Sequence, residues 1–170
     1  MEYKWVGAIL IIASCSGYGF AIAAGKRREE RLLFQLMEIL QFMEKELQYR
    51  LTALPDLCRM AAGEARGPLH VVFMNLYREL NWQKLPDAES CMYAAIQKSG
   101  EMPTKVRRLL IHLGHSLGRF DLPGQIQGIQ SIQKRCETSL QSILQSRDER
   151  LRSYQTLGIC AGVALAIILI

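Results

Sequence analysis

The sequence has few of the residues that build metal sites and disulfide frameworks. Its five cysteines are scattered and form no CxxC pair; they are Cys15, Cys58, Cys91, Cys136 and Cys160. Structural zinc sites and disulfide-rich domains space their cysteines more regularly, so this pattern argues against both and fits a reducing compartment. We expect no metal and no other cofactor.

Several signatures of catalysis and of nucleic-acid binding are also missing. No segment matches GxxxxGK[ST], so the chain is not expected to hydrolyse ATP itself. Basic residues are not interleaved with aromatic ones, which argues against nucleic acid as a partner. No segment alternates apolar and polar residues as a strand does, and there is no hairpin turn signal. These absences favour an all-α, non-enzymatic protein with no small-molecule substrate.

Both ends of the chain lack charge. No charged residue lies within Trp5–Gly25 or Ser153–Ile170, and all but Glu2 and Lys4 lie in between. A helix that crosses a bilayer needs about 20 apolar residues, which the first segment provides and the second nearly provides. The pattern predicts an N-terminal transmembrane anchor (1–25), a polar domain (26–152) and a C-terminal membrane segment (153–170).

Basic residues beside both apolar segments predict the orientation. Lys26, Arg27, Arg28 and Arg31 follow the first segment, and three arginines (Arg147, Arg150 and Arg152) precede the second. Positive charge next to a membrane helix favours the cytoplasmic side, so the polar domain is expected to be cytoplasmic, with lipid headgroups near its bases. Small residues at spacings of four indicate packing of the membrane helices, namely Gly17, Ala21, Gly158 and Gly162.

A second interpretation of the N-terminus places the domain outside the cell. Ile12–Cys15 resembles a lipoprotein lipobox, and Ala21–Ala23 resembles a signal-peptidase site. The chain would then be an exported helical binding module anchored through Cys15. Against this alternative, the apolar run continues well past Cys15, and the strong positive cluster lies on the wrong side of it.

Apolar spacing predicts helices throughout the polar domain. A stripe at steps of three and four marks a long first helix: Leu33, Leu36, Leu40, Met43 and Leu47. Further helices are expected near 55–65, around Val71–Leu80, over 87–99 and over 104–118, and a long last helix is expected to follow a cap at Asp121. The last helix carries a stripe of Ile129, Cys136, Leu140, Ile143 and Leu151. These elements predict a compact bundle of about six helices flanked by the two membrane helices.

One short motif matches a catalytic sequence signature. Gly114–Gly118 matches GxSxG, in which Ser116 would be the nucleophile of an α/β-hydrolase. The preceding residues have helical spacing instead of strand character, and no histidine follows the serine. His112 and His115 share a helical face and could bind a metal together with Asp121, but no further pair of ligands is apparent. Helix packing explains the glycines better than catalysis does.

The same stretch resembles a known family. Leu113-Gly114-x-x-Leu117-Gly118-x-x-Asp121-x-x-x-Gln125 is similar to the LGxxLGxxDxxxQ signature of the stage III sporulation protein AB family. A second segment, from Glu46 through Tyr49 and Thr52 to Leu54, resembles that family's E-h-x-Y-x-x-T-P-L, with Ala53 in place of proline. The likeness extends over the whole chain, including its length and both ends.

The resemblance implies a function. Members are expected in the mother-cell membrane of endospore-forming bacteria, and they resemble the cytoplasmic helical domains of type II secretion platform protein F and type IV pilus relatives. By that analogy the chain would be an assembly or adaptor protein that links a cytoplasmic ATPase, stage III protein AA, to the channel between mother cell and forespore. Candidate contact residues for this partner are Gly114, Gly118, Arg119, Asp121 and Gln125. Packing and capping are the alternative roles for these residues.

Overall fold

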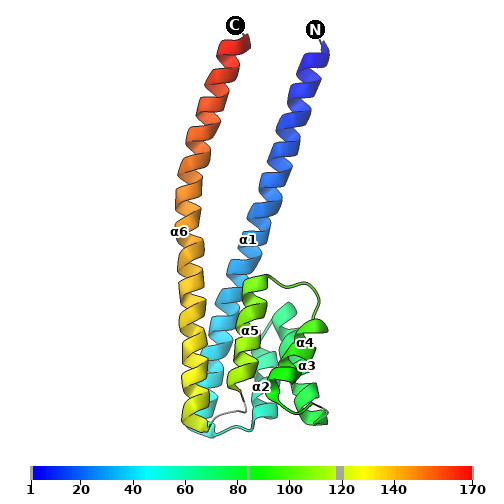
Figure 1. Cartoon of the computed structure of the whole chain (residues 1–170), viewed down its shortest axis with the longest axis vertical. Coiled ribbons are helices and arrows are strands. Elements are labelled where there is room, and N and C mark those ends of the chain that lie inside the picture. The colour runs from blue at the N-terminus through cyan, green and yellow to red at the C-terminus, as the bar shows by residue number, and fades with distance from the viewer. Residues whose placement is uncertain (1, 84, 118–120, 170) are drawn as a thin grey trace.

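The computed structural model of the chain is all-helical (Figure 1). It describes the backbone of residues 2–83, 85–117 and 121–169, and the side chains of 25–83, 85–117 and 121–145. Within these residues there are six helices and no strand: α1 (Glu2–Arg50), α2 (Leu54–Glu64), α3 (Pro68–Trp82), α4 (Ala88–Gln97), α5 (Thr104–Ser116) and α6 (Leu122–Leu169). The predicted fold class is confirmed.

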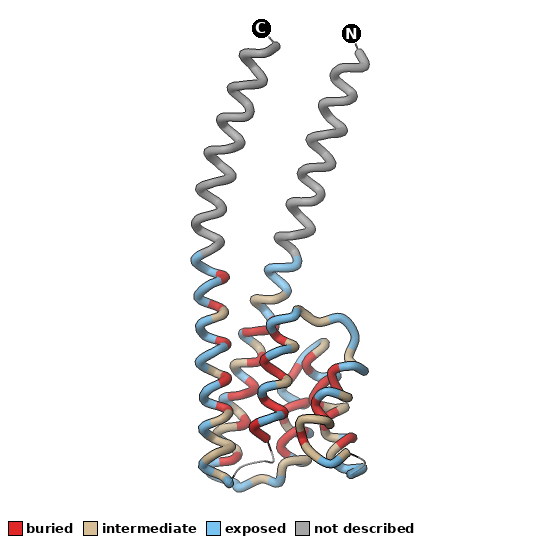
Figure 2. The backbone as a smooth tube through the Cα atoms, viewed as in Figure 1, coloured by how far each residue is buried: buried red, intermediate tan, exposed pale blue. Residues whose placement is uncertain are grey.

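Helices α1 and α6 lie side by side and antiparallel in their described parts (Figure 1). Helices α2 and α5 pack against this pair, and α3 and α4 pack in turn against α2 and α5. The predicted stripe of α1 is buried, with Leu33, Leu36, Leu40 and Met43 fully covered. On α6, Ile129, Cys136, Leu140 and Ile143 are buried too; the predicted stripe residue Leu151 lies outside the described side chains. In Figure 2 the buried positions of α6, in red, lie along the side that faces the rest of the bundle.

A polar bridge holds the same two helices in register. The carboxylate of Glu44 on α1 accepts hydrogen bonds from Gln130 Nε2 at 2.6 Å and from Gln133 Nε2 at 2.9 Å. Both glutamines belong to α6, so one acidic side chain meets two amides of the glutamine-rich helix. Antiparallel packing also means that α1 reaches the bundle, and α6 leaves it, at the same end (Figure 2).

The short helices follow the predicted boundaries closely. Pro55 and Pro68 occupy the first turns of α2 and α3, where a missing N–H costs little, and the Asp87 carboxylate caps α4 by accepting from the Ser90 N–H at 3.3 Å. Helix α5 was expected to reach Gly118 but ends at Ser116. Leu117 adopts an extended conformation instead, and the residue is buried, with 1% of its surface exposed.

The predicted anchors fall outside this description. Within the residues whose side chains are described, no helix is long and apolar enough to cross a membrane. Segments 1–25 and 153–170 lie beyond those residues, apart from Gly25. The two-anchor organisation therefore stays a prediction, as do the packing roles of Gly17, Ala21, Gly158 and Gly162.

A strained leucine at the turn between α1 and α2 offers a test of the fold. Leu51 has a φ of 52° and is 68% exposed. A left-handed conformation costs an L-residue about 1–2 kcal/mol, and glycine is the usual residue after a helix end. We expect Leu51→Gly to raise the free energy of unfolding by about 0.5–1 kcal/mol, measured by urea denaturation.

Leu51→Ala is the matched control for this change. Alanine loses the same exposed side chain but keeps a Cβ, so the backbone strain should remain and the stability should change little. Equal stabilisation by glycine and alanine would show that the exposed leucine side chain, and not the backbone conformation, is the unfavourable feature.

Candidate functional site at the corner between helices α5 and α6

The signature segment forms the corner where α5 ends and α6 begins. Its two leucines, Leu113 and Leu117, are both buried, and they anchor the end of α5 in the core. The described polar members, Asp121 and Gln125, lie at the start of α6. Gly118 and Arg119, two of the predicted contact residues, lie outside the described residues.

Gly114 allows α5 to approach α4 closely. A Cβ built on Gly114 would lie 2.6 Å from Met92 Cβ and 3.3 Å from the Ala88 carbonyl oxygen. Real Cβ atoms do not come so close to another carbon, so only glycine permits this spacing of the two helices. The glycine is buried, which gives it an internal packing role; whether it also affects partner binding stays a prediction.

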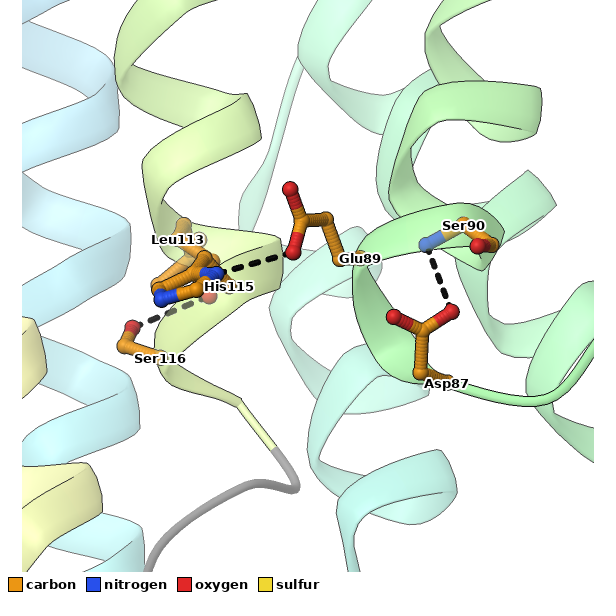
Figure 3. Close-up of polar contacts among 6 residues, drawn as sticks. All are labelled: Asp87, Glu89, Ser90, Leu113, His115 and Ser116. Atoms are coloured by element: carbon orange, nitrogen blue, oxygen red, sulfur yellow. Dashed lines mark hydrogen bonds and ion pairs between the residues drawn. The ribbon is translucent and has the colours of Figure 1, made fainter.

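Ser116 makes the matching contact with α6. A Cβ on Gly128 would lie 2.5 Å from Ser116 Cβ, so the small serine and the glycine sit directly against each other. The Ser116 hydroxyl is buried and donates to the Leu113 carbonyl at 2.9 Å (Figure 3). The GxSxG serine therefore lies on a helix, as the spacing of the preceding residues predicted, and not on a strand-to-helix elbow.

The histidines near the corner have other partners. His115 Nδ1 lies 2.8 Å from Glu89 Oε2, an interaction that connects α5 to α4, and the ring points toward that carboxylate in Figure 3. His112 is exposed and lines a groove beside α6. Within the described residues, no three His, Cys, Asp or Glu side chains are grouped as metal ligands.

Asp121 caps α6. Its carboxylate accepts from the Gly124 N–H at 3.2 Å, and its carbonyl accepts from the Gln125 N–H at 3.0 Å. A negative side chain at this position also interacts favourably with the positive end of the helix dipole. The predicted cap is confirmed, and because Asp121 is exposed, its carboxylate also remains accessible to a partner.

The second segment that resembles the family, from Glu46 to Leu54, forms the turn between α1 and α2. Thr52 Oγ1 donates to Glu46 Oε2 at 3.4 Å, and Arg50 Nη1 lies 3.5 Å from the other oxygen of the same carboxylate. These contacts tie the end of α1 to the chain that enters α2. Tyr49 is 82% exposed and contributes little to the core.

The described cysteines are buried thiols and not reactive ones. Burial raises the pKa of Cys58 to about 12, with a smaller contribution from Cys91, and burial raises the pKa of Cys136 to about 11. The thiolate is the nucleophilic form, so these side chains act as small apolar core residues at neutral pH.

Comparison with known proteins agrees with this geometry. The sequence matches the profile of the family described as Stage III sporulation protein AB (spore_III_AB) over residues 4–170. The chain belongs to this family. Its members are named for sporulation and not for a catalytic activity.

Two relatives extend the comparison. The Stage III sporulation protein AB of Bacillus subtilis (strain 168) is 23% identical over 169 residues, which cover 98% of each chain. A solved structure of Stage III sporulation protein AB is similar with a TM-score of 0.63 and 21% identity, over 72% of this chain and 98% of that one. At this identity the structural likeness supports the fold alone.

Sequence reasoning missed one residue of the corner, Gly128. The spacing of Gly124 and Gly128, four residues apart on the last helix, was a usable signal for close packing, because such a pair exposes backbone on one helix face. It could not identify Ser116 as the neighbour, since that pairing depends on how α5 and α6 meet.

The two close contacts predict what larger residues would do. Gly114→Ala and Gly128→Ala would each place a Cβ at an impossible distance from Met92 or Ser116. Overpacking of this kind should lower the free energy of unfolding by about 1–3 kcal/mol in each variant, measured by chemical denaturation of the purified chain.

Gly63→Ala is the control for helix propensity. Gly63 lies on α2 with nothing within 4 Å of its built Cβ, so alanine there should stabilise the protein by up to about 1 kcal/mol. Stabilisation by all three substitutions would contradict the close packing of this corner.

Proposed function

We propose that this member of the sporulation family is a non-enzymatic adaptor. It links a cytoplasmic ATPase, stage III protein AA, to the membrane channel complex between mother cell and forespore. Its helical domain (26–152) lies in the mother-cell cytoplasm, and the segments 1–25 and 153–170 hold it to the membrane. The observation that carries the proposal is the antiparallel pairing of α1 and α6, joined to family membership.

The direction of the two long helices supports the tethering. Helix α1 reaches the bundle at the end where α6 leaves it (Figure 2), so the two uncharged segments of the sequence continue from one end of the domain. Both could then enter one membrane without a long linker. The opposite end, which carries the α5–α6 corner, would face the cytoplasm (Figure 1).

The chemistry of the corner supports binding rather than catalysis. Its serine is buried against Gly128, Gly114 is packed on Met92, and Asp121 caps a helix. None of these roles activates a nucleophile or a proton donor. The exposed Asp121 and the half-buried Gln125 are the described contact candidates, and Gly114 would act on the partner surface through the packing beneath it.

The first test determines on which side of the membrane the helical domain lies. Residues 1–153 are fused to green fluorescent protein and, separately, to alkaline phosphatase, in a sporulating host. We expect fluorescence without phosphatase activity, because positive charge beside the membrane helices favours the cytoplasmic side. Phosphatase activity without fluorescence would mean export, would contradict the adaptor, and would make lipidation at Cys15 the next question.

Contact with the ATPase is tested at Asp121. Asp121→Ala should cost about 1 kcal/mol of stability through loss of the cap. If the carboxylate also touches the partner, the affinity of the full chain for stage III protein AA should fall by at least about tenfold, a loss of more than about 1.4 kcal/mol in binding. Co-purification and a binding titration of the detergent-solubilised chain measure the effect.

Asp87→Ala is the matched control for the capping effect. Asp87 caps α4 with the same geometry, accepting from a backbone N–H three residues on, so it should show a similar loss of stability. Its complex with the ATPase should be unchanged. Equal binding by both alanine variants and the parent chain would remove Asp121 from the contact surface.

A further inference from the structure

A cationic groove separates the outer faces of α5 and α6. Its volume is about 430 Å³, and its walls carry Lys105, Arg108 and His112 from α5 and Arg135, Ser139 and Ser142 from α6. None of the described residues that line it is acidic. Charges of one sign in a concave surface reinforce one another and attract anions.

Two of the cations are not neutralised within the described structure. Lys105 Nζ lies 3.5 Å from the Glu29 carboxylate, whereas Arg108 and Arg135 form no ion pair with any described residue. A guanidinium presents a planar fork of donors that matches the oxygens of a phosphate group. The serine hydroxyls now donate to helix carbonyls, and they can rotate toward a ligand oxygen instead.

The groove opens near the end of the bundle where α1 enters. Its residue Lys105 pairs with Glu29, about 6 Å along α1 from Gly25, and Arg28 in the same turn donates to the Glu101 carbonyl at 3.1 Å. The basic run 26–28 lies between this pair and the predicted anchor. The groove and the basic run therefore lie at the same end of the bundle, with the Glu29–Lys105 ion pair between them.

We propose that this groove binds the phosphate headgroup of an anionic phospholipid. The inference rests on the membrane-anchored placement proposed above, and it adds a specific lipid site to the general attraction of the basic run. Charge complementarity and the position beside α1 favour lipid over an acidic segment of a partner protein. The groove would hold the domain at a fixed orientation to the membrane while the opposite corner stays free.

The histidines provide a local readout of binding. The chain has three, and only His112 lines the groove, whereas His70 Nδ1 lies 2.7 Å from the Ala62 carbonyl and His115 faces Glu89. The full chain, labelled with ¹³C-histidine in dodecyl maltoside micelles, is titrated with dihexanoyl phosphatidylglycerol. We expect a saturable shift of the His112 signal and almost none for His70.

Two double variants separate the groove from overall charge. Arg108→Gln with Arg135→Gln removes two cations from the groove, and Arg107→Gln with Lys134→Gln removes two cations from adjacent positions outside it. The first pair should weaken binding of phosphatidylglycerol by about 30-fold, because each of the two cations raises the affinity for an anionic lipid by a factor of roughly five to six. The second pair should bind as the parent chain does.

The remaining ligands decide the source of the phosphate. Dihexanoyl phosphatidylcholine should leave His112 unshifted, and inorganic phosphate should shift it only at far higher concentration. Equal affinity for inorganic phosphate would assign the site to a free anion and overturn the lipid. No His112 shift with any of these ligands, or equal binding by both double variants, would overturn the site altogether.

The ATPase complex gives a separate outcome. The groove variant could lose binding to the ATPase while its affinity for phosphatidylglycerol stays unchanged. The groove would then be a protein contact, and the proposed lipid site would be wrong. The lipid titration contains no ATPase, so its result stands apart from the adaptor function. Membrane sidedness is likewise read from the fusion proteins and not from this titration.

Discussion

The antiparallel contact between α1 and α6 is the interaction on which the rest of the structure depends. Each helix contributes one apolar stripe, and the stripes are buried together with the shorter helices around them. Glu44 adds a polar bridge to two glutamines that resists sliding of one helix along the other. Because the pair is antiparallel, it also brings the two ends of the domain to one side, as the proposed membrane tethering would need.

In the corner between α5 and α6, the described residues of the family signature have clear roles in packing and helix capping. Gly114 and Gly128 remove side chains where α5 meets α4 and α6, and Ser116 fills the remaining space. Two buried leucines hold the end of α5 in the core, and Asp121 caps the start of α6. A partner could still recognise the exposed side of this corner, and its shape would depend on that packing.

The two ends of the domain have different surface chemistry. The α5–α6 groove and the basic run of α1 concentrate positive charge near the end where α1 enters, whereas the signature corner lies at the other end. These two surfaces fit the proposed placement between a membrane and a cytoplasmic partner. The separation follows from the length of α5, which carries Lys105 at one end and Ser116 at the other.

The sequence by itself determined the helices, their apolar faces and the Asp121 cap, because these depend on spacing and capping within a few residues. It also carried the family signature. Only the tertiary structure decided that Gly114 meets Met92, that Gly128 meets Ser116, and that Arg108 and Arg135 share one groove. Those pairings join helices distant in the chain, and the period of a single helix says which face is buried but not which neighbour covers it.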